Sequence, residues 1–325
     1  MKIRAIRFHE TGGPEVLKLE AIELPEPAAG EIRVRLKAIG VNYIDTYQRS
    51  GLYKLPLPSG IGLEGAGVVE AVGKDVARVE IGDRVAYANG PPGVYAEAHN
   101  VRADRVVKIP ASVSDEQAAA MMLKGLTVRY LIKETYPVKA GEIVLWHAAA
   151  GGVGLIACQW LKALGVTVIG TVGSEAKAQL ARAHGAEHII LYRKEDVAKR
   201  VRELTGGKGV PVVYDSVGKD TFIGSLDSLQ TRGLMVSFGN ASGPVTGVDL
   251  SILTQKGSLY VTRPTAAHYN QTTEELDAAA ADLFDVIASD KVRIEIHQRY
   301  KLADAAQCHR DLESRKTTGA SVILP

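Results

Sequence analysis

Apolar and polar residues follow two different periods along this chain, and the change of period divides the sequence. Over the first 125 residues, short runs alternate at every second position, which is typical of half-buried strands. Glycine and proline turns such as Thr11–Pro14 separate these runs. We therefore expect an irregular β-rich domain with strands at Lys2–Phe8, Glu31–Ile39, Gly65–Val72, Arg84–Tyr87 and Val94–His99, and then a helix over Ser114–Leu123.

From about Leu126 to Thr262, apolar runs of strand length alternate with segments of helical period. Such alternation predicts a parallel, doubly wound sheet with helices on both faces, the arrangement of a Rossmann domain. The predicted strands are 142–146, 166–172, 188–192, 210–217, 233–238 and 259–262, and the predicted helices are 155–164, 175–184, 194–204 and 222–229. The tail adds predicted helices at 277–288 and 303–314 and a last strand, Gly319–Leu324, which we expect to return to the first domain.

A glycine turn joins the first of these strands to its helix. It reads His-Ala-Ala-Ala-Gly-Gly-Val-Gly over residues 147–154. Glycines let the backbone approach a pyrophosphate, and the helix N-terminus offers N–H groups to it. The pattern departs from G-x-G-x-x-G at Ala149, where we expect a more restricted turn. Strand, turn, helix and returning strand together favour dinucleotide binding; the alternative is a glycine turn that binds nothing.

Composition narrows the functional classes. The chain has 325 residues, 46% hydrophobic and 23% charged, with a net charge of +2, so it attracts neither nucleic acid nor anionic membranes in general. No apolar stretch is long enough for a bilayer, and the N-terminus is typical of a strand rather than a signal peptide. Cys158 and Cys308 are too few for a disulfide framework, which predicts a reducing, cytoplasmic location.

The order of short motifs carries a family resemblance. The motifs are Gly12–Leu17, Gly40–Asp45, Arg49–Tyr53, Gly62–Gly67, Lys124–Thr127, Ala148–Gly154, Tyr214–Gly218, Ser237–Asn240 and Thr318–Pro325. In this order the chain resembles the medium-chain dehydrogenase/reductase superfamily and, within it, the zinc-free NADPH:quinone oxidoreductases related to zeta-crystallin. The resemblance covers essentially the whole length.

The resemblance implies a division into two domains. A GroES-like substrate domain would comprise residues 1–125 and 264–325, with a Rossmann domain at 126–263 between them. The active cleft is expected between the two domains. A homodimer is also implied, in which strand 259–262 extends the sheet across a twofold axis.

The alcohol dehydrogenase branch of the same superfamily holds zinc, and the comparison argues against zinc here. Where that branch has its first cysteine ligand, this chain has Asn42–Asp45, and where it has Gly-His-Glu, this chain has Gly62-Leu63-Glu64. The four-cysteine cluster is missing after Tyr87. Because zinc needs three or four converging donors, we predict no metal site. A quinone is already electron-poor, and it accepts hydride without a Lewis acid.

The expected cofactor is NADPH. The second strand of the Rossmann pattern ends at Gly173 and Ser174 without the carboxylate that binds the ribose of NAD. Lys177 follows one helical turn later and can meet a 2′-phosphate, although a lysine on a solvated helix surface is the alternative. Glu175 is a nearby acid that weakens the argument if its side chain turns inward. Tyr192 is expected alongside adenosine, and the resemblance directs Arg315 to the same phosphate.

The remaining cofactor contacts come from the resemblance. Asn42 and Asp45 would border the nicotinamide. Thr127 and Tyr130 are expected at the start of the long helix that leads into the Rossmann domain. Gly152 and Val153 would meet the pyrophosphate, and Val217, Phe238, Gly239, Asn240, Arg263 and Pro264 would complete the site. Core packing is the alternative role for Phe238.

The expected reaction is hydride transfer from the nicotinamide to a quinone or another electron-poor molecule. Tyr47 and Tyr53, in a loop after Asp45, are candidates to stack on the ring or donate to its oxygen, with a structural role as the alternative. Water or a tyrosine would supply the proton. Two other functions stay open: reduction of alkenal or enoyl double bonds, and non-enzymatic nucleotide or RNA binding. We interpret the basic stretch Lys199–Arg202 as a solvated helix face, so no nucleic acid is expected.

Overall fold

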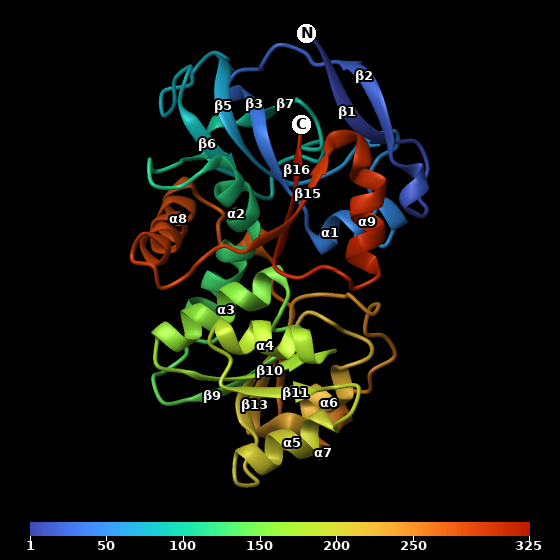
Figure 1. Ribbon diagram of the computed structural model, residues 1–325, viewed down its shortest axis with the longest axis vertical. Coiled ribbons are helices and arrows are strands. Elements are labelled where there is room, and N and C mark those ends of the chain that lie inside the picture. Colours follow the sequence, from blue (N-terminus) through green and yellow to red (C-terminus); the bar gives the residue numbers. More distant parts are fainter. The chain divides into compact units, whose positions relative to one another are not determined.

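The computed structural model describes all 325 residues, which form two compact units (Figure 1). Unit 1 comprises Met1–Leu126, Asn270–Ala288 and Ile294–Pro325, and unit 2 comprises Thr127–Tyr269 and Ser289–Arg293. Unit 2 thus extends beyond residue 263, the end of the Rossmann domain predicted from the sequence. Two contacts explain the difference: the Tyr269 ring stacks on Tyr130, and the Gln159 side chain exchanges two hydrogen bonds with the backbone of Arg293.

Unit 1 is rich in strands, as the alternating pattern predicts, and its strands pair antiparallel except for one parallel pair, Ile296–Lys301 with Ala320–Leu324. A three-stranded sheet has the order β2 (Lys18–Glu23), β1 (Lys2–Phe8), β4 (Ser59–Gly60). A larger sheet has the order β15 (Ile296–Lys301), β16 (Ala320–Leu324), β3 (Glu31–Gly40), β5 (Glu64–Val72), β6 (Arg84–Tyr87), β8 (Val107–Lys108), and β7 (Ala98–Arg102) also pairs with β3. The return of the last strand is confirmed, because Val322 lies opposite Gly40, and Figure 1 shows β16 in red beside β3 in blue.

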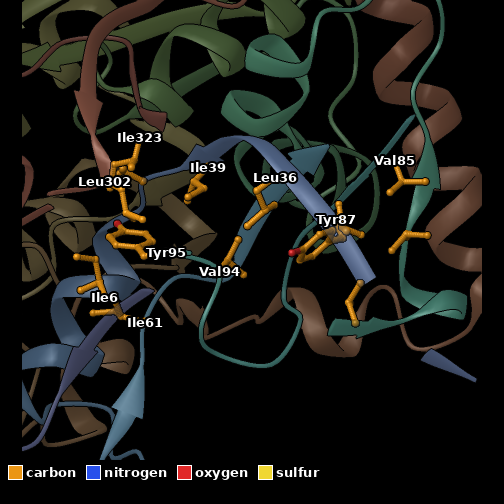
Figure 2. Packing of buried hydrophobic residues seen from close by; sticks show 14 of the residues in the cluster. Ile6, Leu36, Ile39, Ile61, Val85, Tyr87, Val94, Tyr95, Leu302 and Ile323 are labelled. Atoms are coloured by element: carbon orange, nitrogen blue, oxygen red, sulfur yellow. The ribbon is translucent and has the colours of Figure 1, made fainter. Parts of the chain in front are cut away.

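The core of unit 1 lies against these strands. Its largest members include Tyr87 and Tyr95, whose rings lie among aliphatic side chains such as Ile6 and Leu36 (Figure 2). The helices of the unit are α1 (Tyr43–Ser50), most of α2 (Asp115–Tyr130), α8 (Thr273–Ala288) and α9 (Ala305–Glu313), and its short 3-10 turns are η1 (Pro14–Val16), η2 (Ala103–Arg105) and η5 (Leu302–Asp304).

Unit 2 is a six-stranded parallel sheet in the doubly wound order of Rossmann domains, which confirms the predicted fold class. The order is β11 (His188–Leu191), β10 (Thr167–Val172), β9 (Ile143–Trp146), β12 (Val210–Asp215), β13 (Leu229–Ser237), β14 (Tyr260–Thr262). The remaining elements are η3 (Leu131–Thr135, a π-helical turn), η4 (Ala266–His268), α3 (Gly152–Ala163), α4 (Glu175–Ala183), α5 (Val197–Leu204), α6 (Phe222–Ser228) and α7 (Ser251–Gln255). No helix combines the length and apolar character needed to cross a membrane.

Helix α2 is longer than expected, and this corrects the placement of two site residues. The prediction ended the helix at Leu123, just before Gly125. The structure continues it to Tyr130. Leu283 packs against Gly125, where a Cβ would come within 2.5 Å of it, so this glycine serves close packing and does not end the helix. Thr127 and Tyr130 therefore lie at the end of this helix and not at its start.

Candidate functional site

The glycine turn has the geometry of an anion site. Gly151 is the extended N-cap of α3, so Gly152 and Val153 occupy the first two helical positions, where backbone N–H groups have no partner within the helix. A Cβ at Gly154 would lie 2.4 Å from the Ala148 carbonyl oxygen, so helix and turn pack backbone to backbone. These features fit the pyrophosphate of a dinucleotide.

The expectation at Ala149 is corrected by its surroundings. A Cβ at Gly170 in β10 would come within 2.7 Å of the Ala149 Cβ, so the missing side chain at Gly170 provides the space that Ala149 fills. The strained backbone lies one residue earlier, at Ala148, whose φ is +55°. The turn therefore accepts alanine in place of the first glycine of the motif.

A buried polar network underlies this turn, and the sequence did not reveal it. His147 contacts Thr171 Oγ1 at 2.9 Å and Ser225 Oγ at 3.0 Å, and the Ser225 hydroxyl donates to Asp215 at 2.7 Å. Asp215 also accepts the Val217 backbone N–H at 2.7 Å. Burial lowers the pKa of His147, against the opposing charge of Asp215. The network ties the ends of three strands together and fixes the predicted site residue Val217.

The residues predicted for adenosine and the 2′-phosphate lie together at the ends of β10 and β11. A Cβ at Gly173 would come within 2.7 Å of the Tyr192 hydroxyl and 3.5 Å of Arg193 Nε. Ser174 caps α4 by accepting the Lys177 backbone N–H. Arg193 is a cation that the prediction from the sequence did not include. At the end of this strand, the prediction included only Tyr192, as a residue alongside adenosine.

The acid that weakened the NADPH prediction is engaged elsewhere. Glu175 is exposed and lies 3.6 Å from the Lys194 ammonium, its ion-pair partner. This end of the sheet therefore carries Lys177 and Arg193, while its carboxylate is paired with Lys194. Cations at this position suit a phosphate dianion.

The predicted residues at the other strand ends are held by local contacts. Arg263 donates to Ser237 Oγ at 3.1 Å and to the Gly239 carbonyl oxygen at 2.9 Å. Phe238 is half-buried, and its ring centroid lies 5.7 Å from that of Trp146, which supports its alternative role in packing. Thr127 hydrogen-bonds to Tyr130, whose pKa burial raises to about 12. Asn240 and Pro264 are half-buried beside them in the chain.

In unit 1, Asn42 and Asp45 belong to one hydrogen-bonded group. The Asn42 backbone N–H donates to Asp45 Oδ2 at 2.9 Å, and its side-chain amide donates to Glu64 Oε2 at 2.7 Å. Glu64 also pairs with the Lys124 ammonium at 3.2 Å. Burial raises the pKa of Asp45 to about 7, although hydrogen bonds from Asn42 and Tyr95 lower it.

The two candidate tyrosines form one aromatic cluster, but only one is in a loop. Tyr47 lies in helix α1, which Gly51 ends with a φ of +83°, and is 8% exposed; the expectation of a loop there is wrong. The sequence hid this helix because it is short and polar. Tyr47 packs edge-on against Tyr53, with ring centroids 5.4 Å apart. Tyr53 is 37% exposed and so offers the accessible ring.

Arg315 lies in unit 1, where its charge lowers the pKa of Tyr43 against a larger rise from burial. Lys177 belongs to unit 2. That both cations reach one phosphate stays a prediction.

The region compared with zinc ligands holds a different donor set. Asn42, Glu64 and Lys124 supply an amide, a carboxylate and an ammonium. The structure contains no group of three or more His, Cys, Asp or Glu side chains that could hold a metal ion. The ammonium would repel a metal cation at this point.

The basic stretch Lys199–Arg202 is largely used within unit 2. Arg200 pairs with Glu203 at 2.8 Å, and the Arg202 guanidinium donates to backbone carbonyls that include Asp227 and Leu229. Its two arginines thus stabilise α5 and the neighbouring turns. Absence of nucleic-acid binding stays a prediction.

Comparison with known proteins agrees with this geometry. Residues 28–111 match the family model described as "Alcohol dehydrogenase GroES-like domain", and residues 152–281 match "Zinc-binding dehydrogenase". A GroES-like unit and a Rossmann unit with this turn define a medium-chain dehydrogenase/reductase. "Quinone oxidoreductase" of Pseudomonas aeruginosa is 59% identical over 99% of both chains, and "Quinone oxidoreductase 1" of Escherichia coli is 56% identical over 98% of this chain and 99% of that protein. This chain belongs to the quinone oxidoreductase family.

A solved structure extends the comparison. The Escherichia coli quinone oxidoreductase complexed with NADPH has a TM-score of 0.98 with this chain at 56% identity, and the match covers 99% of this chain and all of that one. The 2-haloacrylate reductase of Burkholderia sp. is 42% identical over 99% of both chains. The predicted resemblance is thereby confirmed.

Proposed function

We propose that this protein reduces quinones with NADPH by hydride transfer. The observation that carries the proposal is the full-length similarity to quinone oxidoreductases, one of them solved with NADPH at a TM-score of 0.98. The site agrees with it, because unit 2 offers an anion-binding turn and cations at the end of β10. When bound, NADPH supplies the hydride, and this chain supplies binding and orientation.

Each end of the cofactor meets a distinct part of the chain in this proposal. The first N–H groups of α3, at Gly152 and Val153, hold the pyrophosphate. Lys177 and Arg193 neutralise the 2′-phosphate, and Arg315 adds a third cation. The remaining contacts are Asn42, Asp45, Thr127, Tyr130, Gly173, Ser174, Tyr192, Val217, Phe238, Gly239, Asn240, Arg263 and Pro264.

Tyr53 is the group proposed to meet the quinone ring. Its partly exposed ring is supported from behind by Tyr47, which limits its motion and favours stacking on a flat acceptor. Tyr47 itself is a supporting residue in this arrangement.

Reduction of an activated carbon–carbon double bond is the second candidate function. It is favoured by the 42% identity to a 2-haloacrylate reductase. Hydride acceptance by a double bond needs the same cofactor site, so the acceptor alone separates the two functions.

Steady-state kinetics with purified protein test the proposal. NADPH oxidation is followed with 1,4-naphthoquinone, 9,10-phenanthrenequinone and 2-chloroacrylate as acceptors. We expect kcat/KM for both quinones to exceed that for 2-chloroacrylate by at least about tenfold, which is roughly 1.4 kcal/mol of transition-state stabilisation. Faster turnover of 2-chloroacrylate would assign the second function, and no NADPH uptake by folded protein would overturn both.

The proposal also covers the setting of the enzyme. Both cysteines are free and buried, and burial raises the pKa of Cys158 to about 12, which suits a thiol that takes no part in chemistry. This supports the predicted reducing cytoplasm. We also propose that the protein forms a homodimer and that its active site needs no zinc. Metal analysis of active protein should therefore find far less than one zinc per chain.

A further inference from the structure

Unit 1 contains a buried ion pair between Lys124 and Glu64. The Lys124 side chain is 6% exposed, Glu64 is fully buried, and Nζ lies 3.2 Å from Oε2. The free energy needed to remove both charges from water exceeds the free energy of their attraction unless further hydrogen bonds to the two groups compensate. The hydrogen bonds of the two groups therefore show what the pair is for.

The carboxylate is fully used, and the ammonium is not. Glu64 accepts the Leu123 backbone N–H on Oε1 at 2.7 Å, and accepts both Asn42 and Lys124 on Oε2. An ammonium has three N–H donors, and Glu64 is the one hydrogen-bond partner that Lys124 has. The other donors are left in a buried place, which is costly unless an acceptor oxygen arrives with a ligand.

The geometry of this pair is fixed from two sides. A Cβ at Gly40 would come within 2.1 Å of Glu64 Oε2 and of the Ala119 carbonyl oxygen, so the backbone of β3 packs directly on the carboxylate. The same oxygen joins Lys124 to Asn42, which the proposed function places beside the nicotinamide. A charge held this firmly needs no reorganisation when negative charge develops next to it.

We propose that the Lys124 ammonium donates to the quinone oxygen that becomes negative on reduction, with Glu64 as its positioning residue. This inference rests on the proposed function. The quinone accepts a hydride with its two electrons as the C–H bond at C4 of the dihydronicotinamide breaks, and the products are NADP⁺ and the monoanion of the hydroquinone. A proton from solvent completes the hydroquinone, and Lys124 keeps its three protons throughout. Lys124 takes the role that a Lewis acid has elsewhere, without a metal.

The main test removes both charges, because Lys124→Met alone would leave a buried carboxylate without its cation. For Glu64→Gln/Lys124→Met, we expect a fall in kcat of about 100-fold, as for the loss of one oxyanion donor, with little change in KM for NADPH. The fall should be larger for a weak acceptor, duroquinone, than for 1,4-benzoquinone, because the weak acceptor depends more on charge stabilisation. An equal kcat in folded double variant and wild type would overturn the proposal.

The matched control deletes another pair with a buried arginine in the same unit. Arg33 lies in β3 and pairs with the exposed Glu26 at 3.2 Å. Glu26→Gln/Arg33→Met should lower Tm without changing kcat on either quinone. If the main double variant does not fold, Lys124→Arg keeps the charge but displaces the donors, and it should lower kcat at least about tenfold at unchanged Tm. An unchanged kcat there would overturn the proposal.

A second readout does not depend on turnover. 4-Nitrophenol, whose ionised form absorbs visible light, is titrated with pH in the presence of each protein and without NADPH. The wild type should ionise the bound phenol at a lower pH than Glu64→Gln/Lys124→Met or Lys124→Arg does. Equal ionisation in all of them, or no binding to the wild type, would refute the role of Lys124. Failure of the wild type to oxidise NADPH with any quinone would instead refute the proposed function.

Discussion

Burial holds two histidines of unit 1 in their neutral form. His99 contacts the Tyr87 hydroxyl at 3.0 Å, and burial lowers its pKa to about 4. Burial and the charge of Arg49 lower the pKa of His309 to about 3. A histidine with a depressed pKa stabilises the fold above its unfolded value of 6.5, and this contribution is lost as the pH falls towards the folded value.

His99 therefore makes a measurable contribution to acid sensitivity. Between pH 7 and pH 5 its share of the free energy of unfolding should fall by about 2 kcal/mol. His99→Gln removes this contribution at both pH values. We therefore expect the difference in free energy of unfolding between wild type and variant to be about 2 kcal/mol smaller at pH 5 than at pH 7. Urea unfolding of both proteins at the two pH values checks it, and the difference between proteins is needed because Asp45 acts in the opposite direction.

Asp45 has the reverse sign because its pKa is raised from 3.8 to about 7. The folded state then holds a proton that the unfolded state has lost, so this residue adds stability as the pH falls from 7 towards 4.

The control for His99 is His9→Gln, at an exposed side chain. A deficit that is the same at both pH values for His99→Gln would contradict the prediction.

Lys177 should determine the preference for NADPH over NADH. Its loss removes a charge-assisted hydrogen bond to phosphate, so Lys177→Ala should raise KM for NADPH about tenfold or more and leave KM for NADH nearly unchanged. Lys199→Ala is the matched control, because Lys199 occupies the same position after the cap of α5. Equal changes for the two cofactors would show that Lys177 does not contact the phosphate.

At the scale of secondary structure, the first turn of α3 packs closely only because Gly154 has no side chain. A Cβ at Gly154 would lie 2.4 Å from the Ala148 carbonyl oxygen, so Gly154→Ala must push the turn away from the helix. We expect at least about a tenfold loss of NADPH affinity and a lower Tm. Binding is measured by calorimetry.

Gly224 provides the control for that substitution. It also lies within a helix, α6, but an added Cβ would meet nothing within 4 Å. Gly224→Ala should leave NADPH affinity unchanged and stabilise the protein by up to about 1 kcal/mol through helix propensity. If both variants bind NADPH normally, close packing at Gly154 does not shape the cofactor site.

The success of prediction at this scale depended on the strength of the hydrophobic period. The parallel strands and α3 to α6 were found because buried strands and amphipathic helices have clear patterns. Helix α1 and strand β15 were missed, since both are short and carry many polar residues. Helix α2 was cut short at Gly125, where the reason for continuing is a packing contact with Leu283 that no local pattern encodes.

At the scale of the whole molecule, strand β14 is the exposed edge of the parallel sheet. Tyr260 is 60% exposed and Val261 is 40% exposed, so an apolar edge with unpaired backbone groups faces solvent. Pairing with a second copy would cover it, which supports the proposed homodimer. Light scattering should give twice the chain mass of 34.7 kDa for the wild type and one chain mass for Val261→Lys.

Ile223→Lys serves as the control for the dimer, because Ile223 is exposed and apolar but lies on α6. It should stay dimeric. A wild type of single-chain mass, or a dimeric Val261→Lys, would place any interface elsewhere.

The candidate site shows where sequence reasoning ends. The glycine turn, Ser174 and Lys177 lie within one continuous segment, so their spacing alone indicated a cofactor site. Lys124 and Glu64 are 60 residues apart. His147 and Asp215 are connected through Ser225, and they lie close enough for this only because β9 and β12 are neighbours. Such pairs depend on tertiary structure, and a buried charge is visible only once its surroundings are known.

The pairing of β16 with β3 also sets an order of events during synthesis. The strand β3 leaves the ribosome well before its neighbour β16, because the whole of unit 2 lies between them in the sequence. At about 5–20 residues per second, the nascent chain keeps this side of β3 uncovered for tens of seconds. Unit 2, nearly continuous in sequence, can fold in the meantime, so we expect chaperones to bind the unfinished chain at β3.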